Sequence, residues 1–176
     1  SSRLLVLGFY TEAEPELGLP SSYEVMVTQA ARLDVVVPFW FQLSRQADGS
    51  IIRLGDLSQQ TIRHTIRAAQ ARGLQVYALI HNLLYGRSGL SRQIAALVLN
   101  DPERRARLVQ QTVGLLVGYG FDGVNIDLEY VPAEARYGLV AYLRELQREL
   151  EPRGLVLTVS VPPKTGDSGS ADWNAG

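Results

Sequence analysis

The chain has 176 residues, of which 46% are hydrophobic and 20% are charged, and its net charge is -1. This length and balance predict one globular domain with a substantial core, and they give no electrostatic reason to expect a nucleic-acid partner. The absence of cysteine excludes disulfides and thiolate metal sites, and because no run of 18 apolar residues occurs we expect no membrane span.

Three apolar runs in the first half of the chain are typical of buried parallel strands, and helical patterns separate them. Asp48-Gly49 predicts a hairpin turn, and Gly73 is placed to end the second helix. The expected elements are strands over residues 3–10, 34–41 and 74–80, a hairpin of residues 41–43 and 51–54, and helices over residues 22–32 and 58–72.

The second half continues the same alternation. Asp101-Pro102 pairs a capping side chain with a proline at the first helical position, which predicts a helix that runs to Tyr119 and is stopped by Gly118 and Gly120. The chain thus predicts an α/β fold with five parallel strands and four main helices. The expected elements are a short helix over residues 91–99, helices over residues 102–119 and 132–150, and strands over residues 121–129 and 155–161.

The strand predicted over residues 121–129 (FDGVNIDLE) carries a polar or acidic side chain at every second position. Successive side chains of a strand point to opposite faces, so Asn125, Asp127 and Glu129 share one face and the apolar residues between them share the other. Such alternation is common in half-exposed antiparallel strands. Helical patterns on both sides instead predict a parallel strand covered by helices, with Asp127 and Glu129 at the inner mouth of a barrel, where barrel active sites lie.

The segment Phe121–Glu129 resembles the active-site signature of family 18 glycoside hydrolases, an Asp-Gly followed by acidic or amide residues at alternate positions and ending in Glu. The stretches VLGFYTE, VPFWF, EYVP and LTVSVPPKT are similar to bacterial cell-wall members of that family, which include spore-cortex-lytic N-acetylglucosaminidases. The resemblance implies a (β/α)8 TIM barrel, of which this chain would cover about the first five strands and four helices. It also implies a secreted, cell-wall or spore-associated protein that acts on a polysaccharide containing N-acetylglucosamine, without a cofactor.

The positions of the acidic residues suggest how such a site would work. Glu129 is the last residue of the inner face, where it can act as the general acid, and Asp127 lies about 6.6 Å away along the strand. Two carboxyl groups this close raise each other's proton affinity. The resemblance implies that Asp127 orients the substrate's acetamide and that the stereochemistry is retained. Asn125 stands where many members of the family carry another Asp, so its role is limited to hydrogen bonding.

Four further residues lie at or just past predicted strand ends, where we expect them to bind substrate: Tyr10, Trp40, Asn82 and Tyr130. For the aromatic side chains, packing in the core is the alternative. His81 lies at a strand end as well and is expected to line the pocket. Asp122 falls on the opposite parity to the catalytic residues, and we expect Asp122 and Gly123 to serve structure rather than chemistry.

We also considered a metal site, because Asn125, Asp127 and Glu129 could hold Mg²⁺ or Ca²⁺ through oxygen ligands. The two histidines lack a zinc-ligand spacing, and no Gly-rich phosphate loop follows the first strand. We therefore expect no metal and no cofactor.

The predicted function is hydrolysis of β-1,4 bonds next to N-acetylglucosamine in peptidoglycan of the spore cortex or cell wall. A chitinase, a chito-oligosaccharide hydrolase and a non-catalytic glycan-binding barrel are the alternatives, and the presence of Glu129 counts against the last of these. Because a complete barrel needs about 250 residues, we expect residues 1–176 to be the N-terminal part of one catalytic barrel. Downstream sequence or another chain would supply strands six to eight.

Overall fold

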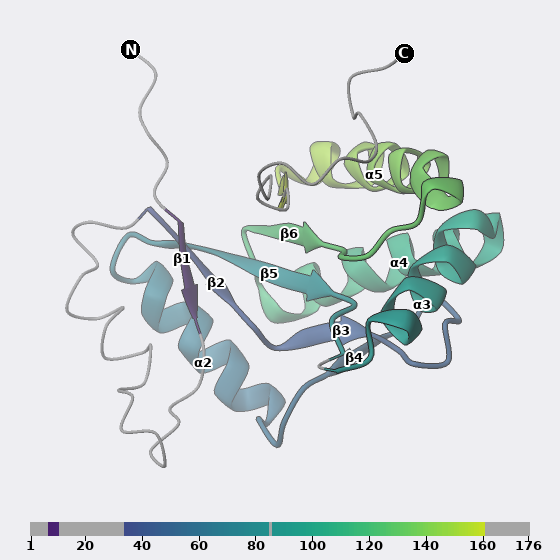
Figure 1. Ribbon diagram of the computed structural model, residues 1–176. Coiled ribbons are helices and arrows are strands. Elements are labelled where there is room, and N and C mark those ends of the chain that lie inside the picture. The colour runs from purple at the N-terminus through teal and green to yellow at the C-terminus, as the bar shows by residue number, and fades with distance from the viewer. Residues whose placement is uncertain (1–6, 11–33, 85, 161–176) are drawn as a thin grey trace, which may run out of the picture.

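The apolar runs form parallel strands of one sheet in the computed structural model, which describes residues 7–10, 34–84 and 86–160 (Figure 1). Each strand pairs with the next parallel strand along the chain, as in a βα series that winds in one direction. The helix predicted over residues 22–32 lies outside the described residues. In order across the sheet the parallel strands are β1 (Leu7–Tyr10), β2 (Val35–Pro38), β5 (Gln75–His81), β6 (Gly123–Asp127) and β7 (Val156–Val159).

A small antiparallel hairpin, β3 (Phe41–Leu43) and β4 (Ile51–Arg53), follows β2, as predicted. Its turn is held by Asp48, whose Oδ1 accepts hydrogen bonds from the Ser50 amide at 3.0 Å and the Ser50 hydroxyl at 2.6 Å. β3 also pairs in parallel with the end of β5, so the hairpin lies at the carboxyl ends of the strands.

The helices are α2 (Gln59–Gln70), α3 (Ser88–Asn100), α4 (Pro102–Tyr119) and α5 (Arg136–Leu150). Side chains cap two of them as the sequence predicts: Ser58 Oγ accepts from the Thr61 amide, and Asp101 Oδ1 accepts from the first amides of α4. Gly120 ends α4 with φ +84°, and Gly118 lies inside that helix. Two short 3₁₀ turns, η3 (Ala133–Ala135) and η4 (Glu151–Arg153), flank α5.

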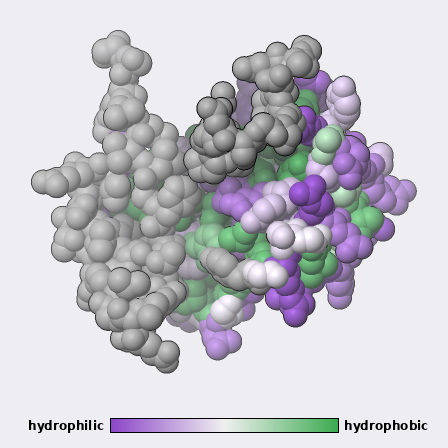
Figure 2. Space-filling view, in the orientation of Figure 1, coloured by the Kyte–Doolittle hydropathy of each residue, from purple (hydrophilic) through white to green (hydrophobic). Residues whose placement is uncertain are grey.

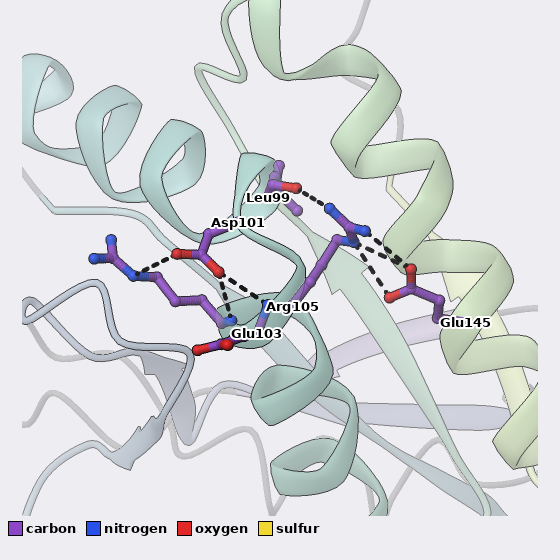
Figure 3. Close-up of polar contacts among 6 residues, drawn as sticks. Leu99, Asp101, Glu103, Arg105 and Glu145 are labelled. Carbon is purple, nitrogen blue, oxygen red and sulfur yellow. Dashed lines mark hydrogen bonds and ion pairs between the residues drawn. The ribbon is translucent and has the colours of Figure 1, made fainter.

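One partly buried guanidinium joins three helices (Figure 3). Arg105 on α4 donates to both carboxylate oxygens of Glu145 on α5 at 3.1–3.2 Å, and its Nη1 donates to the Leu99 carbonyl of α3 at 2.7 Å. Since this ion pair is partly shielded from water and bidentate, it fixes the relative position of the helices more firmly than an exposed pair would.

Two hydrophobic clusters cover the two faces of the sheet. The outer core lies between the sheet and the helices; in Figure 1, α2 lies below the strands, α5 above β6 and α4 behind them. The inner cluster lies on the opposite face and is smaller. The outer core includes Val36, Ala78, Ile80, Val124 and Ile126, and the inner cluster comprises Val35, Val37, Tyr77 and Leu79 with Phe39 packed against them.

The surface of the described residues mixes hydrophilic and hydrophobic side chains over the face shown in Figure 2. The exposed large hydrophobic residues include Val156 and Val159 of β7, which pairs only with β6 among the described residues. Among these residues, no helix is long and apolar enough to cross a membrane.

Candidate active site

Alternation along β6 divides its side chains between the two faces of the sheet. Val124 and Ile126 are fully buried in the outer core, so Asn125 and Asp127 point to the inner face. The register of the parallel strands sets Asn125 opposite Leu79 and Asp127 opposite His81. The inner face therefore changes from apolar to polar toward the carboxyl ends of β5 and β6.

Asn125 joins β6 to β7 through both ends of its amide. Its Nδ2 donates to Ser160 Oγ at 2.8 Å, and its Oδ1 accepts from Thr158 Oγ1 at 2.8 Å, while only 3% of the residue is exposed. An aspartate at this position would offer Ser160 no donor. The amide is thus built into the inner face as a hydrogen-bonding link.

Asp127 is half-buried beside this link. Burial raises the pKa of its carboxyl above the ordinary value, and a hydrogen bond from Ser160 opposes that rise. The two neighbouring carboxyl groups were predicted to raise each other's proton affinity; in the structure, burial is the main cause of the shift at Asp127. Ser160, which contacts both Asn125 and Asp127, was missed by the sequence reasoning, although the alternation in LTVSV already places Thr158 and Ser160 on one face.

Glu129 lies beyond the end of β6, and the side chain of Asn82 holds its main chain. Asn82 Oδ1 accepts from the Glu129 amide at 2.8 Å, and Asn82 Nδ2 donates to the Glu129 carbonyl at 2.8 Å. The same Nδ2 donates to the carbonyl of Ser91 in α3 at 3.1 Å. A side-chain amide therefore continues the pairing of β5 with β6 after the strand ladder has ended.

The chain turns sharply directly after Glu129. Tyr130 has φ +57°, a left-handed conformation that costs a non-glycine residue about 1–2 kcal/mol. Its side chain is 46% exposed, so it is open to solvent at the mouth of the sheet. Tyr130 remains a predicted substrate contact.

His81 faces Asp127 across the strand pair and is 2% exposed. Its ring stacks on Phe39 at a centroid distance of 4.1 Å, and its Nδ1 accepts from the Leu83 amide at 3.0 Å. The proton of the neutral ring is therefore on Nε2, which is buried and has no hydrogen-bond partner among the described residues. Burial lowers the pKa of His81 to about 4, so the imidazole is neutral at pH 7.

Asp122 and Gly123 lie at the opposite end of β6 from the acidic residues. Asp122 Oδ2 accepts from the Val76 amide at 2.8 Å and from Gln70 Nε2 at 3.1 Å. A Cβ on Gly123 would lie 2.5 Å from the Val156 carbonyl oxygen. Both residues therefore stabilise the start of β6, at the opposite end of the strand from Glu129.

Two of the predicted substrate contacts, Trp40 and Asn82, are buried in the structure. Trp40 is 3% exposed and packs in the outer core near Phe121, with ring centroids 6.5 Å apart. Asn82 is 2% exposed, and its amide is occupied by Glu129 and Ser91. Both side chains are thus held within the described part of the protein, and their contact with substrate stays a prediction. Tyr10 ends β1 opposite Pro38, but its side chain lies outside the described residues.

Strand parity explains both placements. Trp40 shares the parity of Val36, and Asn82 shares that of Ile80, so each points toward the helices. The inward positions belong to their neighbours Phe39 and His81, which stack on one another. As for a metal, no group of three or more His, Asp or Glu side chains in the described part of the chain is arranged to hold one.

Comparison with known protein families identifies the family of this chain. The sequence profile of glycosyl hydrolases family 18 matches residues 84–175, which is more than half of the chain and includes β6 and Glu129. The chain belongs to glycosyl hydrolase family 18.

Individual relatives agree with this family. The chain is 37% identical over 115 residues to the "Putative sporulation-specific glycosylase YdhD" of Bacillus subtilis, and the match covers 65% of this chain and 27% of the relative. A chitinase structure from Chromobacterium violaceum matches with a TM-score of 0.73 and 25% identity, covering 89% of this chain and 45% of that one. The spore cortex-lytic enzyme SleL of Bacillus cereus matches with a TM-score of 0.75 and 18% identity, covering 93% and 36%.

These matches confirm the fold predicted from the sequence. The sheet and its helices correspond to part of the TIM barrel of family 18 structures. The chain spans less than half the length of each of these three relatives. In TIM-barrel enzymes the active site lies at the carboxyl ends of the strands. His81, Asp127, Glu129 and Ser160 lie at those ends of β5, β6 and β7.

Proposed function

We propose that the protein is a glycoside hydrolase that cleaves β-1,4 bonds next to N-acetylglucosamine in peptidoglycan, with Glu129 as general acid and base. The observation that carries the proposal is the row of polar residues on the inner face of β6, which leads from Asn125 through the half-buried Asp127 to Glu129 beyond the strand end. A carboxyl group at this place can protonate a leaving oxygen, and a second one nearby can stabilise positive charge.

The proposed reaction is retaining and assisted by the substrate. Glu129 gives its proton to the glycosidic oxygen as the bond from that oxygen to the anomeric carbon breaks. The acetamide oxygen of the same sugar, oriented by Asp127, forms a bond to the anomeric carbon. Water then attacks that carbon, the bond from the carbon to the acetamide oxygen breaks, and Glu129 recovers a proton from the water. Asn125 keeps Ser160 in place beside Asp127.

The spore cortex is the proposed source of the glycan, because one relative is named a sporulation-specific glycosylase and one similar structure is titled a spore cortex-lytic enzyme. A secreted, spore- or wall-associated location follows from the same proposal. Chitin is the second candidate substrate, since the Chromobacterium violaceum structure is titled a chitinase. Tyr10 and Tyr130 remain the proposed sugar contacts.

The test compares the wild-type protein at full length with Glu129→Gln and Glu134→Gln. Glu134 is an exposed glutamate in η3, so its loss controls for the removal of one negative charge nearby. We expect Glu129→Gln to lower turnover of purified cortex peptidoglycan by about 10²–10⁴-fold, and Glu134→Gln to retain it. Turnover retained in Glu129→Gln would exclude this mechanism and favour a non-catalytic binding barrel or a different acid. Colloidal chitin in parallel distinguishes the two substrates.

A further inference from the structure

The main chain of the proposed general acid is held by a side chain that the sequence suggested for sugar binding. Asn82 contacts Glu129 twice, once at its amide and once at its carbonyl, each at 2.8 Å. Both partners are main-chain atoms, and the Asn82 side chain is buried. The orientation of the Asn82 side-chain amide is fixed, because only its oxygen can accept the hydrogen bond from the Glu129 N–H.

A second anchor ties Asn82 to the helix layer. Its Nδ2 also donates to the Ser91 carbonyl at 3.1 Å, and Ser91 Oγ accepts from the Leu84 amide at 3.1 Å. Ser91 is fully buried in α3. The position of Glu129 is therefore coupled to α3 through one amide that uses both of its protons and its oxygen.

The two Asn82 contacts hold the backbone where the strand pairing ends and a strained turn begins. The strand register ends at the pair His81 and Asp127, so no strand main chain among the described residues pairs with Glu129. The next residue, Tyr130, is held in the left-handed region at φ +57°. Without a partner for Glu129, the turn would be free to relax toward a less strained conformation, and the carboxyl group would move with it.

We propose that Asn82 is a positioning residue for Glu129: its side-chain amide fixes the main chain of the general acid and thereby the place of its carboxyl group. This inference rests on the proposed function, since it concerns the catalytic role of Glu129. Asparagine is the one amino acid of this side-chain length that offers both a hydrogen-bond acceptor and two donors. Asp lacks the donors, and Gln is longer by one methylene.

The proposal predicts a loss in catalysis rather than in binding. Asn82→Ala removes the contacts while leaving the Glu129 side chain intact, and a displacement of about 1 Å at a catalytic group can lower the rate about 100-fold. We expect kcat on the cortex glycan to fall about 10- to 100-fold, with KM little changed.

Ser91→Ala is the matched control. It removes a hydrogen bond from the same buried network, to Leu84, but keeps the Ser91 carbonyl that Asn82 uses. We expect Ser91→Ala to lower the melting temperature and to leave kcat essentially unchanged. An equal fall of kcat in both variants at matched folded fraction would assign the effect to general destabilisation and overturn the proposal.

Hydrogen exchange read by NMR tests the contact without relying on activity. In the full-length wild-type protein, the Glu129 amide should be protected, and in Asn82→Ala it should exchange about tenfold faster or more, while the Ile126 amide inside β6 stays protected. A Glu129 amide that exchanges like an exposed loop amide in the wild type overturns the proposal even if the variant does not fold. Faster exchange without any change in kcat overturns it too. A wild-type protein that cleaves no glycan overturns the proposed function, and the exchange rates still decide whether Asn82 holds Glu129.

Discussion

His81 shows how strongly the inner face of the sheet is separated from water. Its imidazole is buried between Phe39 and the strand ends, and this burial lowers its pKa to about 4 from an ordinary value of 6.5. The ring lies in register with Asp127, whose carboxyl pKa is raised by burial as well. Both shifts favour the neutral form, so the two residues report the same desolvated environment.

The His81 shift predicts how stability depends on pH. Between pH 6.5 and 4, the unfolded state binds a proton at His81 that the folded state does not bind, so stability falls as the pH falls through this range. The loss amounts to at most about 3 kcal/mol and is complete below about pH 4. Urea unfolding at a series of pH values should show a smaller fall for His81→Gln than for the wild type.

His64 supplies the control for this measurement, because it is exposed on α2. His64→Gln controls for the replacement of an exposed histidine by glutamine. Parallel curves for the wild type and His81→Gln would mean that His81 is not buried in its neutral form.

At the site, the sequence predicts residue types better than it predicts which neighbour faces inward. The alternation in β6 correctly divides Asn125 and Asp127 from Val124 and Ile126. At the ends of β2 and β5, polarity and aromatic character favoured Trp40 and Asn82, while parity favoured Phe39 and His81, and parity proved decisive. Counting parity from the buried valines would also have found Phe39, whereas His81 was already expected to line the pocket.

At the level of elements, the start of β6 depends on close contact with β7. A Cβ at Gly123 would lie 2.5 Å from the Val156 carbonyl oxygen and 3.0 Å from the Tyr77 ring. Gly123→Ala therefore forces β7 away from β6, and overpacking of this kind costs about 1–3 kcal/mol. We expect this variant to lower the free energy of unfolding by that amount in urea titrations.

Gly114→Ala is the matched change, since a Cβ there meets no atom within 4 Å in the exposed side of α4. It should stabilise the protein by about 0.5–1 kcal/mol, because alanine loses less conformational freedom than glycine in a helix. A destabilisation of similar size in both variants would show that the loss of glycine itself, rather than the approach of β7, explains the effect at position 123.

The boundaries of the elements follow the sequence where a local signal exists. Asp101-Pro102 and Gly120 set the two ends of α4 as predicted. α3 begins three residues before the predicted Ser91, and no side chain caps its start, so the sequence offered no signal there. β6 ends at Asp127 rather than Glu129, because the main chain of Glu129 binds the Asn82 side chain, a contact between residues 47 positions apart.

At the scale of the whole molecule, the described strands form part of a barrel with the proposed acid at its mouth. Among the described residues, β1 pairs only with β2 and β7 only with β6, and Val156 and Val159 of β7 are exposed. Unpaired strand edges of this kind favour association in water. We propose that further sequence or a second chain pairs with β7 and supplies the rest of the substrate pocket.

The measurement that tests the central claim most directly compares two leaving groups in wild-type protein and Glu129→Gln. A sugar leaves poorly without a proton, whereas dinitrophenolate leaves without one, so a missing general acid harms the first reaction far more than the second. We predict that Glu129→Gln lowers kcat/KM by about 10²–10⁴-fold for an N-acetylglucosamine oligosaccharide and by much less for the dinitrophenyl glycoside. Equal losses on both substrates would contradict the role of Glu129 as the general acid.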